Sequence, residues 1–153
     1  IGKAAINQQE FYLLPVGDKL MQFDKIAINT IVKNHTGEAS SCDIEFSEDF
    51  EKYNHDYLTY TSQVANSCMD RDLSEDCMVI GTSAIVDTEL EFAGGMYSGI
   101  YNNPFIIWGK YSKHFFKYYL NISFQFHHAQ MDGMHAAQFL NNLQQMIHTL
   151  RVK

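Results

Sequence analysis

The sequence predicts an α+β domain in which a mixed β-sheet is covered by helices. Residues 116–127 alternate apolar and polar side chains as a strand does, and residues 136–150 repeat apolar side chains at helical spacing. A third pattern, an acidic helix start followed by spaced aromatic residues, occupies residues 47–66. With 46% hydrophobic residues, the 153 residues suffice for one compact domain with a sizeable core.

The first elements expected are a hairpin and a strand. Apolar residues between Phe11 and Phe23 flank Val16-Gly17-Asp18, and Gly17 supplies the backbone freedom that a tight turn needs. Lys25 to Val32 then alternates as a strand with one apolar face. The chain is therefore expected to begin with β structure.

A helix is expected next, with Ser47 as its N-cap and its end near Asn66. The acidic stretch from Asp43 to Glu51 is interpreted as the solvated start of this helix, because acidic side chains favour a helix N-terminus. The apolar side of the helix is expected to consist of Phe50, Tyr53, Tyr57, Leu58, Tyr60 and Val64.

The middle of the chain is expected to alternate loops with short strands. Ser67 to Glu75 is polar and suits an exposed loop, whereas Cys77 to Ile80 and Ala84 to Thr88 are typical of two short strands. The glycines between Ala93 and Asn103 predict a flexible surface loop. Their spacing matches neither a P-loop nor G-x-G-x-x-G, so no phosphate site is predicted there.

The C-terminal third gives the clearest signals. Phe105 to Tyr111 is apolar and β-prone, and Phe116 to His127 predicts one long strand. The aromatic residues of Phe115 to Phe126 are interpreted as core. After Asp132-Gly133 the period changes to that of an amphipathic helix. Strand ends of this kind present side chains to a substrate on a rigid support.

Composition excludes several classes of function. The net charge is -7 and the 11 Lys and Arg residues are scattered, so neither a basic face nor a nucleic-acid partner is expected. No apolar run is long enough for a transmembrane helix, so no membrane partner is expected. Cys42, Cys68 and Cys77 lack C-x-x-C spacing, which favours reduced cysteines in a cytoplasmic protein. The chain opens at Ile1 rather than Met, so residues 1–153 are expected to be a single domain lacking an N-terminal portion.

A candidate site lies where the last strand meets the last helix, at His127-His128-Ala129-Gln130-Met131-Asp132-Gly133. Imidazole is the commonest general base near neutral pH, and a nearby carboxylate can hold the structure that orients it. Asp132 could serve equally as a helix N-cap. These residues alone leave open whether the histidines are catalytic or a half-buried structural pair. They predict no metal site, since neighbouring strand residues point to opposite faces.

The wider string from His127 to Gln144, HHAQMDGMHAAQFLNNLQ, resembles the active-site segment of the chloramphenicol acetyltransferase family. That family shows HHAxxDGxH followed by an apolar helix that ends in a Leu-Gln pair. Weaker agreement lies upstream, in Gly109-Lys110-Tyr111 and in the hairpin that begins at Glu10. The resemblance covers about Glu10 to Ile147 and is tight over the last part.

The resemblance implies a fold, a reaction and an assembly. The fold would be a two-layer sandwich of the CoA-dependent acyltransferase type. The reaction would transfer an acetyl group from acetyl-CoA to a hydroxyl of chloramphenicol, which would confer antibiotic resistance, without a metal. His128 would be the general base, and Asp132 would be structural, paired in the family with an arginine near the N-terminus. The site would lie between subunits of a homotrimer.

One departure from the family concerns the oxyanion. The family stabilises the oxyanion with a serine just after a Pro-Trp pair, and this sequence has neither. The aligned register lands near Asp87, and a shift of one residue offers Thr88 as the hydroxyl donor, with Phe92 where the family often has phenylalanine. Losing one oxyanion donor costs about 10²–10³ in rate.

The departure leaves two alternatives open: a family-like protein that binds a ligand without catalysis, or an O-acetyltransferase for another small alcohol. The residues that bind CoA are not identified by any motif. Because CoA is anionic, the candidate cations are Lys110, Lys113 and Lys117.

Overall fold

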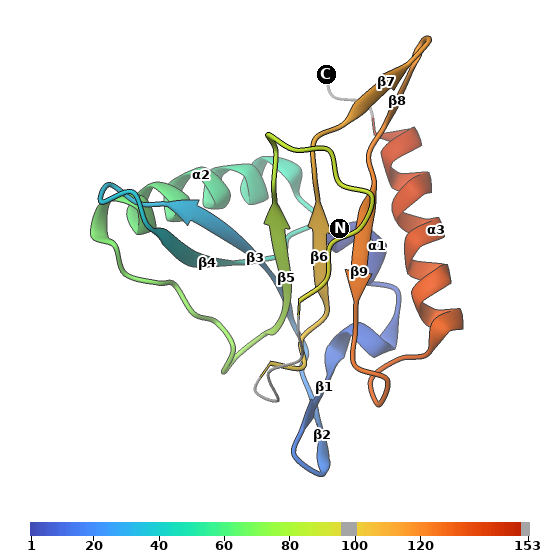
Figure 1. Cartoon of the computed structure of the whole chain (residues 1–153). Coiled ribbons are helices and arrows are strands. Elements are labelled where there is room, and N and C mark those ends of the chain that lie inside the picture. The colour runs from blue at the N-terminus through green and yellow to red at the C-terminus, as the bar shows by residue number, and fades with distance from the viewer. Residues whose placement is uncertain (96–100, 151–153) are drawn as a thin grey trace.

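A computed structural model describes residues 1–95 and 101–150 of the chain (Figure 1). Its centre is a mixed sheet of five strands in the order β4, β3, β5, β6, β9. The central pairs β3–β5 and β5–β6 are parallel, and the outer pairs β3–β4 and β6–β9 are antiparallel. The strands are β3 (Ile26–Lys33), β4 (Ala39–Glu45), β5 (Met78–Ala84), β6 (Phe105–Trp108) and β9 (Ile122–Gln125).

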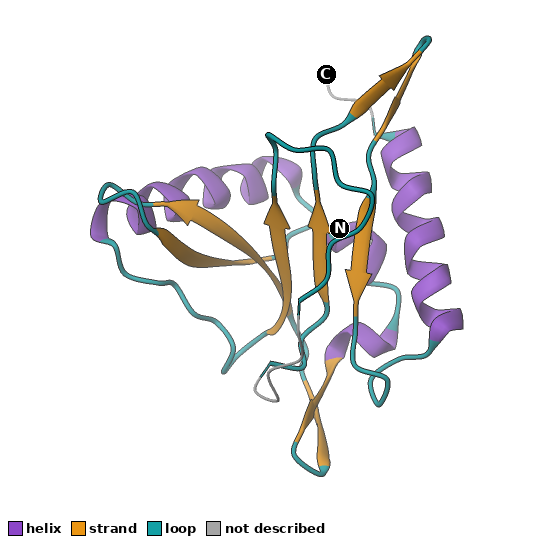
Figure 2. Cartoon of the chain, in the orientation of Figure 1, coloured by secondary structure: helices purple, strands orange, loops and turns teal. Residues whose placement is uncertain are grey.

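Helices cover one face of this sheet, as Figure 2 shows. The helices are α1 (Gly2–Ala5), the short 3-10 helix η1 (Gln9–Tyr12), α2 (Phe50–Ser67) and α3 (Gly133–Thr149). The main core joins α1, η1 and α3 to the even-numbered side chains of the sheet, such as Ile28, Ile80 and Ile106. The α+β prediction, with a mixed sheet covered by helices, is therefore confirmed.

Two hairpins project from the body of the chain. The expected N-terminal hairpin is formed by β1 (Leu13–Val16) and β2 (Lys19–Gln22), and Gly17 turns it at φ +62°. The second, formed by β7 (Ser112–His114) and β8 (Lys117–Tyr119), extends beyond the sheet in Figure 1. The prediction of one strand over 116–127 is therefore wrong, because the alternating run is divided between β8 and β9.

The exposed second hairpin also corrects the interpretation of its aromatic residues as core. Phe115 and Phe116, at its tip, are 94% and 96% exposed. Only Phe124 and Phe126, which belong to or follow β9, pack against the main core. Alternation reports which side chains share a face, but it does not report whether anything covers that face.

Strand β4 was not predicted, and it corrects the interpretation of Asp43 as part of a solvated helix start. Asp43 lies in β4 and is 4% exposed. Its carboxylate accepts hydrogen bonds from Asn29 Nδ2 at 2.7 Å and from the Leu73 N–H at 3.0 Å. The N-cap of α2 is Asp49 rather than Ser47, and its side chain accepts from the N–H groups of the first turn.

Of the two strands expected at 77–80 and 84–88, the first is confirmed as part of the longer β5 (Met78–Ala84), and the second is wrong, because residues 85–88 form a turn. Strand β5 extends past Ile80 through the polar Thr82, whose Oγ1 donates to the buried Asn29 carbonyl at 2.6 Å. The expected loop begins one residue later than predicted, at Cys68, because Ser67 ends α2, and Arg71 within it forms a bridge with Cys42 of β4. Part of the expected glycine-rich loop, residues 96–100, lies outside the described residues.

Candidate active site

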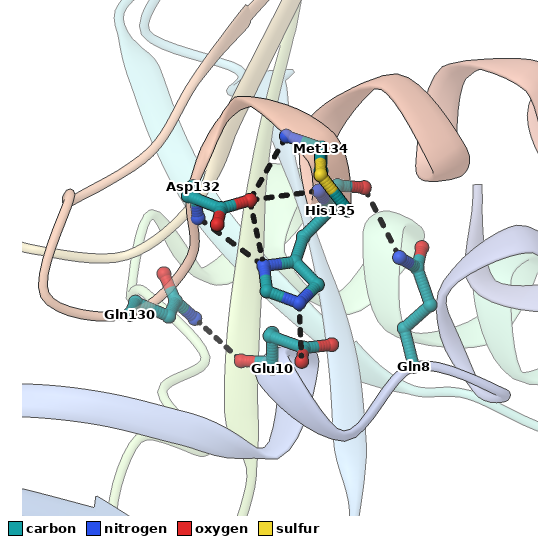
Figure 3. A network of polar contacts seen from close by, with 6 residues as sticks. All are labelled: Gln8, Glu10, Gln130, Asp132, Met134 and His135. Atoms are coloured by element: carbon teal, nitrogen blue, oxygen red, sulfur yellow. Dashed lines mark hydrogen bonds and ion pairs between the residues drawn. The ribbon is translucent and has the colours of Figure 1, made fainter.

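Asp132 is the N-cap of α3, so the capping role that its position allowed is confirmed. Its Oδ1 accepts hydrogen bonds from the N–H groups of Met134 at 2.9 Å and His135 at 3.1 Å (Figure 3). The hydrogen bond from the His135 N–H is the largest cause that holds the pKa of the Asp132 carboxyl below its usual range. The Met134 N–H and the nearby His135 and His128 side chains act in the same direction. Asp132 therefore starts the helix as a carboxylate.

The turn between β9 and α3 is closed by its own backbone. The carbonyl of His127 accepts from the N–H groups of Gln130 at 2.9 Å and Met131 at 3.2 Å. The Ala129 N–H donates to His127 Nδ1 at 3.1 Å, which fixes that nitrogen as an acceptor. His127 is therefore tied into the turn, whereas His128 is exposed at its apex. An exposed imidazole on a closed turn is accessible to a substrate hydroxyl.

A polar network joins this turn to the segment before the N-terminal hairpin. Gln130 Nε2 donates to the carbonyls of Glu10 at 3.0 Å and Leu13 at 2.6 Å. Gln8 Nε2 donates to the His135 carbonyl at 3.1 Å. These contacts link parts of the chain that are about 120 residues apart, and Figure 3 shows those of Gln8 with His135 and of Gln130 with Glu10 beside Asp132. The start of η1 therefore supports the turn that carries His128.

Thr88 lies in the turn that follows β5. Its N–H donates to the Ile85 carbonyl at 3.3 Å, and its own carbonyl accepts from the Lys110 N–H at 2.7 Å. Gly109 permits this approach, because a Cβ at that position would stand 2.5 Å from the Thr88 carbonyl oxygen. The Gly-Lys pair at 109–110 therefore supports the Thr88 turn directly.

Thr88 and His128 lie at opposite ends of the sheet within one chain. Strand pairing places Ala84, which precedes the Thr88 turn, beside Trp108 and Ile122, at the start of β9. His128 follows the other end of β9, beyond the Gln125–Phe105 pair. The three residue steps of β6 from Phe105 to Trp108 span about 10 Å, and both turns extend further outward. One chain therefore does not bring the two candidates together.

A groove of about 670 Å³ crosses the sheet face opposite the helices. His127 lines it beside Gln125 and Phe105, and neither His128 nor Thr88 is among its lining residues. Its other end holds Asn29, Asp43 and Arg71, none of which was predicted as a site residue. These three residues come from separate segments and belong to no periodic pattern in the sequence. Only the tertiary structure therefore shows that they lie together.

The described part of the chain contains no helix that is long and apolar enough to cross a membrane. Within residues 1–95 and 101–150, no group of three or more His, Cys, Asp and Glu side chains is arranged to hold a metal ion.

The mixed sheet, its helical layer and the turn before α3 define a protein with the CoA-dependent acyltransferase fold. One similar solved structure is a chloramphenicol acetyltransferase, with a TM-score of 0.77 and 19% identity over 93% of this chain and 71% of that one. The dihydrolipoamide acetyltransferase of Azotobacter vinelandii is also similar, with a TM-score of 0.70 and 13% identity over 96% of this chain and 66% of its own. These low identities establish the fold alone.

The sequence comparisons establish the family. A family model described as chloramphenicol acetyltransferase matches residues 1–144. The chloramphenicol acetyltransferase of Clostridium perfringens is 29% identical over 150 residues, which are 96% of this chain and 69% of that protein. That of Clostridium butyricum is 31% identical over 122 residues, or 76% of this chain and 55% of the relative. The chain belongs to the chloramphenicol acetyltransferase family, a family of acyltransferases.

Proposed function

We propose that the protein transfers an acetyl group from acetyl-CoA to a hydroxyl of chloramphenicol, with His128 as the general base. The observation that carries the proposal is the closed turn after β9, which presents His128 to solvent while Asp132 fixes the start of α3. Family membership supplies the acyl-transfer chemistry. The names of the Clostridium relatives supply the acceptor.

The reaction follows from the chemistry of imidazole and a thioester. A ring nitrogen of His128 takes the proton of the acceptor hydroxyl, and the oxygen attacks the thioester carbonyl carbon directly. The tetrahedral oxyanion then collapses, the carbon–sulfur bond breaks, and the imidazolium returns its proton to the thiolate of CoA. A hydroxyl donor to the oxyanion completes the site, and we assign this role to Thr88. Asp132 acts on the turn rather than on the substrate.

The separation of Thr88 from His128 supports a site shared between copies of the chain. Since the two side chains follow opposite ends of the sheet, His128 of one copy would meet Thr88 of its neighbour. A closed ring of three copies repeats that contact three times, which is the homotrimer expected from the sequence. Lys110, whose N–H contacts the Thr88 carbonyl, and Lys113 and Lys117 of the β7–β8 hairpin would then be candidates to bind the phosphates of CoA.

We also propose that the protein acts in the cytoplasm. Its three cysteines, Cys42, Cys68 and Cys77, are free, and Cys42 and Cys77 are buried. Burial is the largest cause that raises the pKa of both buried thiols, so they are poor nucleophiles.

The test is acceptor-dependent release of the CoA thiol, with the product identified by mass. We expect chloramphenicol to accelerate release and to gain one acetyl group, and His128→Ala to lower kcat by about 10²–10⁴. The matched control is His148→Ala, an exposed histidine of α3 whose partner is Gln144. Undiminished activity of His128→Ala would contradict the assignment of the base. Acetylation of another small alcohol in place of chloramphenicol would contradict the acceptor, and tight binding without turnover would favour the ligand-binding alternative.

A further inference from the structure

His135, three residues into α3, lies between two carboxylates. Its Nδ1 is 3.0 Å from Asp132 Oδ1, and its Nε2 is 3.2 Å from Glu10 Oε1 (Figure 3). Asp132 belongs to the turn before α3, and Glu10 belongs to η1 at the other end of the chain. The imidazole is partly shielded, with 38% of its side chain exposed. It is the one described side chain that contacts both carboxylates.

The protonation state of the ring decides how many of these contacts are favourable. A neutral imidazole has a single N–H, so with Nε2–H donated to Glu10, Nδ1 can only accept, from the Asp132 N–H at 3.3 Å. Its lone pair then faces the Asp132 carboxylate. An imidazolium donates to both carboxylates at once. Donation to both carboxylates at once is therefore possible only for the charged ring.

We propose that His135 is a positioning residue, which holds the turn bearing His128 against η1 by bridging Asp132 and Glu10. Three further contacts lie beside the bridge: Gln8 to the His135 carbonyl, and Gln130 to the carbonyls of Glu10 and Leu13. These three are made by neutral amides and fix the backbone. The bridge adds the contact between the His135 ring and the carboxylate of Asp132, the residue that ends the turn.

The bridge affects His128 because of where the turn is anchored. On one side the turn continues from β9, which is paired with β6. On the other side it ends at Asp132, whose carboxylate serves α3 and His135 together. Loss of the contact between Asp132 and His135 would let the hydrogen bonds from the Gln130 and Met131 N–H groups to the His127 carbonyl open. The His128 side chain would then occupy several orientations. This would lower the fraction of molecules with the base in place, without removing any group that contacts the substrate.

The test is a double-mutant cycle with His135→Gln and Glu10→Gln, each of which removes one partner of the bridge and keeps a hydrogen-bonding group. The first measurement is amide hydrogen exchange at Gln130 and Met131, whose N–H groups donate to the His127 carbonyl. We expect each variant to accelerate this exchange about tenfold, and the double variant to be no worse than either alone. The matched control is His148→Gln at the far end of α3. Unchanged exchange in both single variants would overturn the proposal.

The second measurement uses turnover and rests on the proposed function. We expect kcat to fall about tenfold in either single variant, while the KM for the acceptor changes less than about twofold. Both are measured well below the melting temperature of each variant, so that a loss of global stability alone would leave kcat unchanged. Accelerated exchange with an unchanged kcat would show that the bridge stabilises the turn without positioning His128, which would contradict the proposal. If the wild-type chain shows no turnover, the exchange measurement still decides on the bridge, so the two failures are distinguishable.

Discussion

Single side chains in this protein serve structure and site together. Asp132 ends the turn that carries His128, starts α3 through two backbone hydrogen bonds, and contacts His135. One oxygen of its carboxylate, Oδ1, makes all three of these contacts, which fits a structural role. Its position in the motif made both roles, cap and site residue, visible in the sequence. The contact with Glu10 through His135 was not visible, because no local pattern connects residues 125 positions apart.

Tyr53 gives a prediction at the residue scale. Burial, with a smaller contribution from Tyr57, raises the pKa of its phenol to about 12 from an ordinary value of 10.0. The folded state therefore holds the proton after the unfolded state has lost it. The resulting stability is complete below pH 10 and is lost as the pH rises towards 12. Between pH 8 and 11.5 the free energy of unfolding of the wild type should fall by about 1–3 kcal/mol more than that of Tyr53→Phe.

Urea unfolding of the two proteins at both pH values measures this difference. Other groups titrate in the same range, but they are common to both proteins and cancel in the comparison. Parallel loss of stability in wild type and Tyr53→Phe would contradict the burial of this phenol.

Helix α3 shows how far an amphipathic pattern predicts contacts at the scale of one element. The expected apolar residues recur as predicted, but only Ala136, Phe139 and Leu143 are buried. Leu140, Ile147 and Leu150 of the same pattern are 39%, 53% and 60% exposed. The edge strand β9 and the N-terminal segment cover only part of the apolar side. The periodicity therefore predicts the helix and the side that faces the sheet. Which residues of that side are buried depends on how far β9 and the N-terminal segment extend over it.

Phe139 is the residue of α3 on which packing against the sheet depends most. It is 0% exposed, and its ring centroid lies 4.8 Å from that of Phe11 and 4.9 Å from that of Phe124. Phe139→Ala should lower the free energy of unfolding by about 3–5 kcal/mol, through lost burial and the cavity that remains. The matched control on the same helix is Leu140→Ala, which should cost less than about 1 kcal/mol. Chemical unfolding measures both, and equal losses would contradict the placement of α3.

The whole molecule shows which parts of a fold a sequence reports. The N-terminal hairpin, β3, α2, β6 and α3 were predictable because each has a local period or a turn residue such as Gly17. Strand β4 and the second half of β5 were missed, because Asp43 and Thr82 are polar residues. Each is buried with a hydrogen-bond partner from another segment, which the local pattern does not report. The motif located the turn of His128. Strand order, which local patterns do not report, places Thr88 at the other end of the sheet.

The central claim is that His128 and Thr88 of different copies complete one site, and mixing two variants tests it. His128→Ala and Thr88→Val should each lower kcat, by about 10²–10⁴ and 10²–10³ respectively. When the two chains are produced together with different tags, every mixed trimer should contain one interface with both intact side chains. In the mixed trimers, this restores about a third of the wild-type sites.

The measurement is chloramphenicol-dependent thiol release by the purified mixed species, whose composition is verified by mass. Recovery to about a third of wild-type activity, far above either parent, is the result that we predict for the purified mixed species. Mixed species no more active than the parents, or a Thr88→Val protein that keeps full activity, would contradict the shared site.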